Sequence, residues 1–178
     1  MRAKILVTGV LVLALASLLI GLSAAGSDKT HFKATLSPYS EVPTNSTTGQ
    51  GDLDLQIDDS AQTITFTLTY SGLAAPAAVA HIHLGARSTN GGVSVFFCGG
   101  GGQGPCPPGT SSEATVTGTI TPANVVGPAA QGIPPATAEG FGELVAAIRA
   151  GVTYANVHNS LFLGGEIRGQ INDSDQRN

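Results

Sequence analysis

Apolar and polar residues alternate through much of this chain, with the period of two that is typical of half-buried β-strands. In one segment Leu53, Leu55 and Ile57 alternate with polar residues, and in the next, 63–70, apolar residues alternate with threonines. Shorter segments of the same kind recur at 31–37, 79–84, 93–97, 114–120, 154–158 and 166–171. The pattern therefore predicts about eight short strands.

One segment has a helical period instead. Phe141, Leu144, Val145 and Ile148 recur at the spacing of one helix face, and Gly151 follows where a helix commonly ends. The chain is also rich in the turn formers glycine (24) and proline (10), which suits many short connections. We predict an all-β fold: an antiparallel β-sandwich or barrel with one short helix before the penultimate strand.

The first 25 residues have a different pattern. Arg2 and Lys4 precede an apolar run over 5–22, and small residues follow at 23–25. This order is typical of a signal peptide cleaved before Gly26. An uncleaved membrane anchor is the alternative, because the run approaches the ~20 residues that span a bilayer. We expect an exported protein (secreted, periplasmic or at the cell surface), with one domain over 26–171 and a disordered tail over 172–178.

Composition narrows the range of partners. Charged residues make up only 11% of the chain, and loss of Arg2 and Lys4 with the signal segment lowers the formal net charge from −4 to −6. Since no basic patch remains, we exclude nucleic acid as a partner. Contact with a membrane is expected only if the N-terminal segment is retained.

The two cysteines of the chain, Cys98 and Cys106, enclose a glycine-rich segment. In an oxidising compartment they are expected to form a disulfide that closes a small surface loop. A metal or catalytic role is less favoured, because there is no CxxC spacing and no adjacent histidine.

Three histidines are candidate metal ligands. His81 and His83 stand two apart in a predicted strand, so their rings project from one face, and His158 lies in another predicted strand. Three imidazoles with an open fourth position suit copper or zinc. The alternative is that the histidines occupy a solvated face, opposite the apolar Ala80 and Ile82, or satisfy backbone groups.

Four further polar residues lie in the last two predicted strands. Tyr154 and Asn156 lie on the same strand face as His158, and Glu166 and Arg168 share a face of the last strand. We interpret these four residues as a structural polar network, because a carboxylate two residues from a guanidinium is normally neutralised by it.

The segments that hold these residues resemble a known family. AHIH at 80–83, YANVH at 154–158 and GEIRGQ at 165–170 together resemble the CHRD domain, first named in chordin and also found singly in bacterial secreted proteins. FKATLSPYSEVP at 32–43 resembles the family's opening strand and turn, and 144–151 its short helix. The resemblance covers roughly 32–171 and implies an extracellular or periplasmic module. In chordin such domains belong to a protein that engages growth factors, a role that does not transfer to a lone domain.

These observations lead to the hypothesis of an exported binding protein rather than an enzyme. Its partner is either copper or zinc, held by the three histidines, or an extracellular protein, in which case the chain is a structural or interaction module. A superoxide-dismutase-like oxidoreductase is suggested by a similar architecture and by the HxH motif. It is disfavoured because that enzyme's paired metal sites use more histidines than the four present here, and fold analogy does not warrant an activity.

The first prediction concerns export. Mass spectrometry of the exported protein should show a chain that begins at or near Gly26, because the small residues at 23–25 suit signal peptidase. An intact Met1 terminus in a membrane fraction would show that the segment is an anchor.

Overall fold

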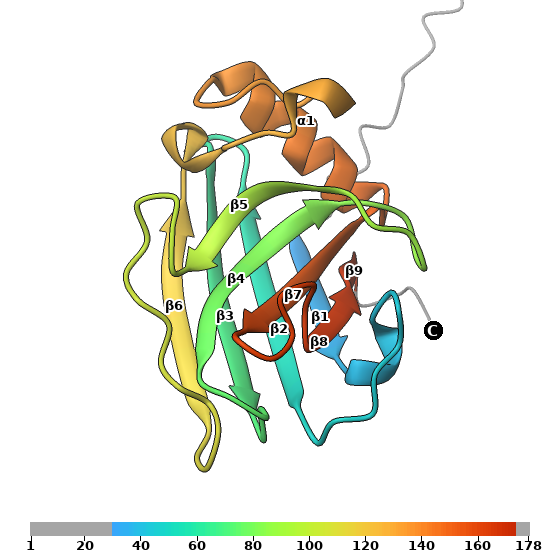
Figure 1. Ribbon diagram of the computed structural model, residues 1–178. Helices are drawn as coiled ribbons and strands as arrows, with labels where there is room; N and C mark the ends of the chain where they lie inside the picture. Colours follow the sequence, from blue (N-terminus) through green and yellow to red (C-terminus); the bar gives the residue numbers. More distant parts are fainter. Residues whose placement is uncertain (1–29, 174–178) are drawn as a thin grey trace, which may run out of the picture.

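The computed structural model describes residues 30–173; the predicted signal segment and residues 174–178 lie outside the described part. Within it, the strands form two antiparallel sheets that pack face to face (Figure 1). The first sheet has the order β6-β3-β2-β1-β9, and the second has the order β5-β4-β7-β8. The strands are β1 (His31–Leu36), β2 (Gln50–Asp58), β3 (Thr63–Ser71), β4 (Ala77–Leu84), β5 (Gly92–Cys98), β6 (Ala114–Ile120), β7 (Thr153–Asn159), β8 (Ile167–Gln170) and β9 (Asn172–Asp173). The predicted all-β sandwich is confirmed.

The hairpin β2–β3 shows why the alternating pattern produces a sandwich. Its register pairs Leu53 with Leu68 and Leu55 with Phe66, so the apolar residues of both strands face one side. They are buried, whereas the threonines and aspartates between them are mostly exposed. Because side chains alternate across a strand, this register gives the first sheet one buried apolar face and one solvent-exposed polar face.

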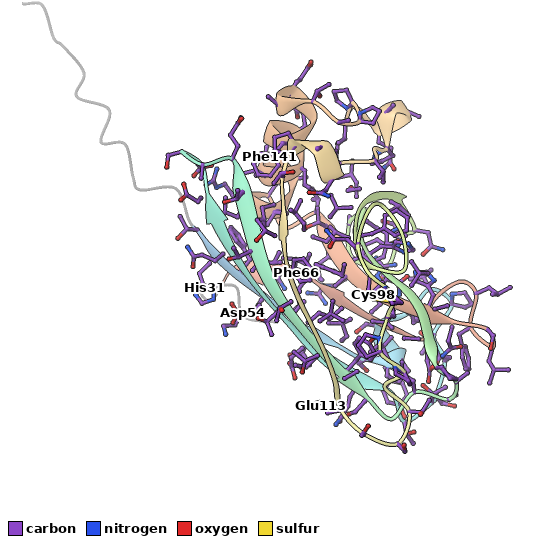
Figure 2. The ribbon with its side chains drawn as sticks, turned by 90° about the vertical axis from the view of Figure 1, so that its left-hand side faces the viewer. His31, Asp54, Phe66, Cys98, Glu113 and Phe141 are labelled. Carbon is purple, nitrogen blue, oxygen red and sulfur yellow. A yellow bond between two sulfur atoms is a disulfide. The ribbon has the colours of Figure 1, made fainter. Side chains whose placement is uncertain are left out.

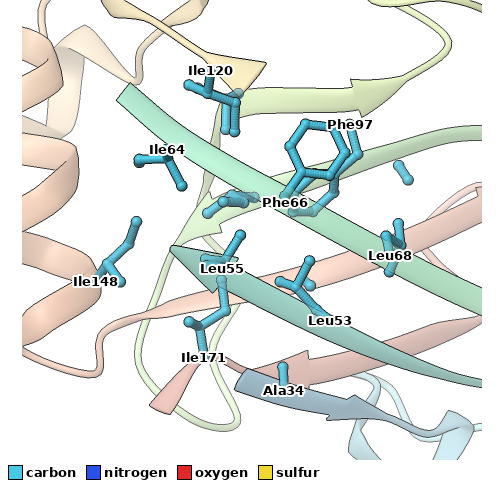
Figure 3. Close-up of a cluster of buried hydrophobic side chains, with 14 of the residues drawn as sticks. Ala34, Leu53, Leu55, Ile64, Phe66, Leu68, Phe97, Ile120, Ile148 and Ile171 are labelled. Carbon is cyan, nitrogen blue, oxygen red and sulfur yellow. The ribbon is translucent and has the colours of Figure 1, made fainter. Parts of the chain in front are cut away.

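The core fills the space between the two sheets (Figure 3). Phe66 of the first sheet packs against Phe97 of the second, with ring centroids 4.8 Å apart. Ile82 and Val157 of the second sheet are fully buried in the same cluster. Burying side chains of this size stabilises the fold by about 1.5–3 kcal/mol each.

The helix α1 (Ala138–Arg149) covers one end of the sandwich (Figure 1). The Thr137 side chain caps its N-terminus by accepting a hydrogen bond from the Gly140 N–H. The residues predicted to form its apolar face, including Phe141 and Ile148, are buried against the core. Three short 3₁₀ helices complete the described elements: η1 (Pro38–Ser40), η2 (Pro122–Asn124) and η3 (Ala129–Gln131).

The two sheets join at one edge. Ser37, just after β1, exchanges backbone hydrogen bonds of 2.9 and 3.2 Å with Arg168 of β8. Gly169 permits this approach, because a Cβ there would lie 2.4 Å from the Thr35 carbonyl oxygen. The sandwich is therefore closed along this edge, beside the polar residues of β7 and β8.

The start of the predicted disordered tail needs correction. Asn172 and Asp173 form β9, which pairs with Lys33 and Phe32 of β1. The polar composition concealed this strand, because an edge strand needs only backbone pairing and commonly carries polar residues. The fully buried Ile171 immediately before it holds the segment against the core.

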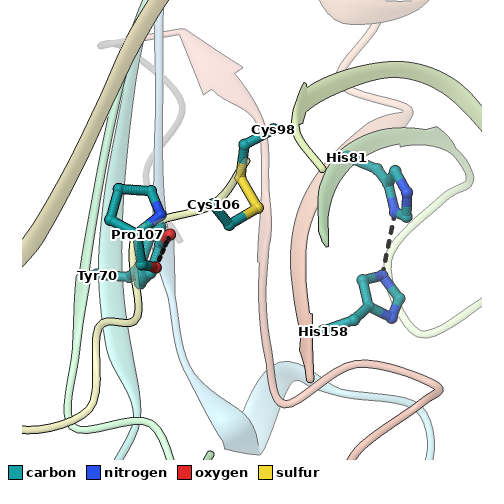
Figure 4. The surroundings of a disulfide bond; sticks show 6 residues. All are labelled: Tyr70, His81, Cys98, Cys106, Pro107 and His158. Carbon is teal, nitrogen blue, oxygen red and sulfur yellow. Dashed lines mark hydrogen bonds between the residues drawn. A yellow bond between two sulfur atoms is a disulfide. The ribbon is translucent and has the colours of Figure 1, made fainter. Parts of the chain in front are cut away.

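Cys98 and Cys106 form the predicted disulfide, with Cα atoms 5.0 Å apart. Cys98 is fully buried and lies opposite Ala80 of β4, so the bridge reaches the core instead of closing only a surface loop. Just beyond it, the Tyr70 hydroxyl donates to the Pro107 carbonyl at 2.7 Å (Figure 4). The disulfide and this bond together hold the segment after β5 across the end of β3.

The second prediction concerns this bridge. Changing both cysteines to alanine should lower the free energy of unfolding by about 2–3 kcal/mol, because a short closed loop no longer restricts the unfolded chain. Urea denaturation measures the change. Thiol labelling of the native protein without reductant should detect no free cysteine, with the reduced, unfolded protein as the positive control. Two labelled thiols in the native protein would exclude the disulfide.

Candidate metal centre

The candidate residues lie on the outer face of the second sheet. In β4, Ala80 and Ile82 belong to the core, so His81 and His83 project to the opposite face. The register of β4 with the neighbouring β7 sets His81 opposite Asn156 and His83 opposite Tyr154. Pairing between two central strands therefore brings together residues more than 70 positions apart in the sequence.

The three histidines are buried. His81, His83 and His158 are 8%, 8% and 9% exposed, although they lie on the face away from the core. Phe96 packs edge-on against the His81 ring, with centroids 4.5 Å apart. Loops cover the rest of this face, so the alternative interpretation of a solvated histidine face is wrong.

The three rings lie together as a group that could hold one ion. One ring nitrogen from each histidine lies within 4.8 Å of the other two. Nδ1 of His81 and Nε2 of His158 are 3.2 Å apart, facing each other (Figure 4). Two nitrogens bound to one tetrahedral ion at ~2.0–2.1 Å would be separated by roughly 3.3 Å, so this spacing matches an edge of a coordination shell.

Backbone carbonyls fix the orientation of two of the rings. Nδ1 of His83 donates to the Gly91 carbonyl at 3.0 Å, and Nδ1 of His158 donates to the Leu163 carbonyl at 3.1 Å. Metal-bound histidines are typically oriented in this way, with the second ring nitrogen as the ligand. Nε2 of His83 is buried and has no hydrogen-bond partner among the described residues. Such an unsatisfied buried nitrogen needs an explanation, and an ion supplies one.

The site favours neutral imidazole. Burial, followed by the charges of neighbouring groups, lowers the pKa of His81 to about 3 and that of His83 to about 4, although the hydrogen bond to Gly91 opposes the shift at His83. Burial also lowers the pKa of His158. Nδ1 of His158 is protonated, because it donates to the Leu163 carbonyl, so Nε2 of the same ring has a free lone pair. In the contact between the two rings, Nδ1 of His81 therefore donates a hydrogen bond to Nε2 of His158. An ion that enters must displace only the proton of this hydrogen bond.

Two residues of the predicted polar network, Tyr154 and Arg168, pack beside His83. The His83 and Tyr154 rings stack in parallel, with centroids 4.7 Å apart, and the Arg168 guanidinium lies 3.4 Å from the centroid of Tyr154. Because β7 lies between β4 and β8, Tyr154 lies between His83 and Arg168. Arg168 also donates to the carbonyls of Ala86 and Thr89, at 3.2 and 2.7 Å. Arg168 thus ties the loop after β4 to the sheet.

Glu166 differs from expectation, because its carboxylate does not neutralise Arg168. It precedes β8 and accepts hydrogen bonds from the Ala74 N–H, at 2.9 and 3.1 Å, and from the Asn159 side chain. The side-chain oxygen Oδ1 of Asn159 in turn accepts from the backbone N–H groups of Leu161 and Phe162. Glu166 and Asn159 therefore shape the loop whose Leu163 carbonyl orients His158.

Glu41 is a site residue that the sequence analysis missed. It is 5% exposed, and its Oε1 accepts a 2.5 Å hydrogen bond from Nδ2 of Asn156. Burial raises its pKa to about 7, although the Asn156 bond and the Arg168 charge oppose the increase. Gly165 permits this packing, because a Cβ there would lie 2.6 Å from the Glu41 carboxylate. A lone glutamate in a turn is usually solvated, so the only signal for it was its place in the family-like segment 32–43.

A family model describing the CHRD domain matches residues 32–171, most of the chain. The chain belongs to the CHRD family. The family segments quoted from the sequence carry the three histidines, the polar network and Glu41, so the CHRD resemblance and the buried polar layer coincide. No curated protein matches the chain. Within residues 30–173, no helix is long and apolar enough to cross a membrane.

The fourth histidine lies elsewhere. Nε2 of His31 is 2.5 Å from Oδ1 of Asp54, on the exposed face of the first sheet (Figure 2). Lys33 shares this aspartate, with its Nζ 2.6 Å from Oδ2. His31 is therefore a natural control for the three buried histidines.

The third prediction concerns the tautomers of the metal-free protein. Long-range ¹H–¹⁵N correlation spectra should show His81, His83 and His158 protonated at Nδ1, because Gly91, Leu163 and the His158 ring accept those protons. His81 and His83 should stay neutral at about pH 5, where an ordinary imidazole with a pKa near ~6.5 is mostly protonated. Protonation at Nε2, or titration near that ordinary value, would contradict the geometry.

Proposed function

We propose that this CHRD domain is an exported module that binds one copper or zinc ion through His81, His83 and His158. The observation that supports this most strongly is the buried Nε2 of His83, which lacks a partner among the described residues and lies beside two other ring nitrogens. Leaving such a nitrogen unsatisfied costs about 1–3 kcal/mol, which coordination of an ion would recover.

The donor set favours late first-row ions. Imidazole suits copper and zinc, whereas magnesium and calcium prefer oxygen ligands. The Irving–Williams order places Cu²⁺ above Zn²⁺ in affinity. Three protein ligands would leave a fourth position for water or for a ligand from another molecule.

We propose binding without turnover, in a compartment that permits disulfides. The Cys98–Cys106 bridge supports an oxidising environment, in agreement with the predicted export. CHRD membership supports the broader description of a binding or interaction module. A metal-free interaction role is the second candidate. It is favoured by Leu161 and Leu163, which are 66% and 81% exposed on the loop beside His158.

The fourth prediction tests the metal site. Added Zn²⁺ or Cu²⁺ should stabilise the mature, untagged protein by about 3 kcal/mol when free metal exceeds Kd by ~100-fold. For a domain of this size the melting temperature should rise by roughly 5–10 °C. Native mass spectrometry should find one ion per chain. Magnesium should have no comparable effect, because the site offers nitrogen ligands.

Two histidine variants supply the matched comparison. His83→Ala should abolish the shift in melting temperature, whereas His31→Ala should leave it unchanged, because His31 lies on the exposed face of the other sheet. A cooperative melt of His83→Ala in chelator shows that the variant is folded. If His83→Ala retains the shift, or if both variants lose it equally, the three-histidine site is wrong.

A further inference from the structure

A cleft of about 440 Å³ opens beside Arg168, separate from the ring nitrogens of the candidate metal centre. One wall is the segment 39–44, which follows β1, and the other is the loop after β4, where Arg87 and Ser88 lie. Arg168 and Gln170 of β8 also line it. A cavity of this size is within the usual range for small-molecule sites.

The two walls are held in place without a ligand. The Asn90 side chain donates to the Val42 carbonyl at 3.1 Å and joins one wall to the other. Asn90 also accepts from Arg168 at 3.3 Å, which ties both walls to β8. A preformed cleft lowers the entropy lost on binding, because little has to be ordered when a ligand enters.

Two guanidinium groups give the cleft its charge. Arg168 is 2% exposed, and its hydrogen bonds to Asn90, Ala86 and Thr89 use three of the five N–H groups of a guanidinium. Arg87 is exposed and lines the same cleft. Burial lowers the pKa of Arg168, the charges of Tyr154 and Glu41 oppose that shift, and the charge of Arg87 adds to it, so the two cations repel each other. An anion between them would relieve this repulsion.

Glu41 cancels only part of that charge at neutral pH. Burial raises the pKa of this carboxyl to about 7, so a large fraction is protonated and can donate a hydrogen bond. The groups that act on it are the amide of Asn156, which donates to it, and the charge of Arg168. Arg87 and Tyr39 line the same cleft. The lining therefore combines two cations with several hydrogen-bond donors.

We propose that this cleft binds a small carboxylate, held by Arg168 and Arg87 and by hydrogen-bond donors on the 39–44 wall. A planar carboxylate fits a guanidinium fork, and charge-assisted pairs of this kind are the strong polar contacts of binding sites. Val42 and Pro43, in the same wall, can pack against a short carbon skeleton. This inference does not depend on metal binding, since none of the three histidines lines the cleft.

Calorimetric titration with fumarate tests the proposal on the mature protein. Fumarate is rigid, and its trans carboxylates cannot chelate one metal ion together. Fumarate should bind at millimolar concentration, whereas the uncharged fumaramide should not. Sulfate should bind more weakly than fumarate, because a tetrahedral oxyanion matches the fork less well.

Charge variants locate the site. Arg87→Gln should weaken fumarate binding about three- to tenfold, because it removes one charge-assisted contact at an exposed position. Lys33→Gln removes the same charge from the other sheet and should leave the affinity within about twofold. Both side chains are exposed, so the fold should tolerate the changes.

The pH dependence tests the role of Glu41. Between about pH 6 and pH 8 the protonated fraction of a carboxyl with pKa about 7 falls roughly tenfold, and fumarate affinity should fall with it. Glu41→Gln keeps an acceptor for Asn156 and cannot ionise, so its affinity should be nearly constant over this range.

Several results would overturn the inference. These are no fumarate binding at millimolar concentration, equal binding of fumaramide, or equal effects of Arg87→Gln and Lys33→Gln. Tighter binding of sulfate than of fumarate would show that the ligand class is wrong. A wild-type affinity that does not change with pH would exclude the role given to Glu41.

Discussion

The antiparallel register between β4 and β7 is the constraint on which the rest of the structure depends. It sets His83 opposite Tyr154 and His81 opposite Asn156, and it turns Ile82 and Ala155 into the core. Because side chains alternate, a slip of one residue would exchange the buried polar and apolar sets of one strand. Apolar burial on one face therefore fixes the position of every candidate ligand on the other.

This register has an unusual consequence, since both faces of the second sheet are buried. One face packs against the first sheet, while the other carries histidines, an arginine and an asparagine under a cover of loops. Burying polar groups is unfavourable unless each finds a partner. Arg168 donates to loop carbonyls, Glu166 accepts from a backbone N–H and an amide, and the histidines are neutral. The buried polar side chains of this face thus hold the loops that cover them. Among the described residues, Nε2 of His83 is the buried ring nitrogen on this face that lacks a hydrogen-bond partner.

Most strands could be predicted from sequence, because apolar and polar residues alternate in a strand that has one buried and one solvent-exposed face, as in β2 and β3. The shared face of His81 and His83 followed from the same rule. The burial of His81 and His83 could not be predicted, because it depends on loops such as 160–165, which are distant in sequence from β4. The role of Glu41 and the contact of Glu166 with Ala74 were missed for the same reason, because both rest on contacts between residues more than 90 positions apart. β9 has no apolar alternation to reveal it.

The measurement that tests the central claim most directly is X-ray absorption at the zinc edge of the zinc-loaded protein. The account predicts three imidazole nitrogens at about 2.0–2.1 Å, with the outer-shell scattering of histidine rings, and one further light atom. A first shell made of oxygen alone, or one with fewer than three imidazoles, would contradict the assignment of His81, His83 and His158 as ligands.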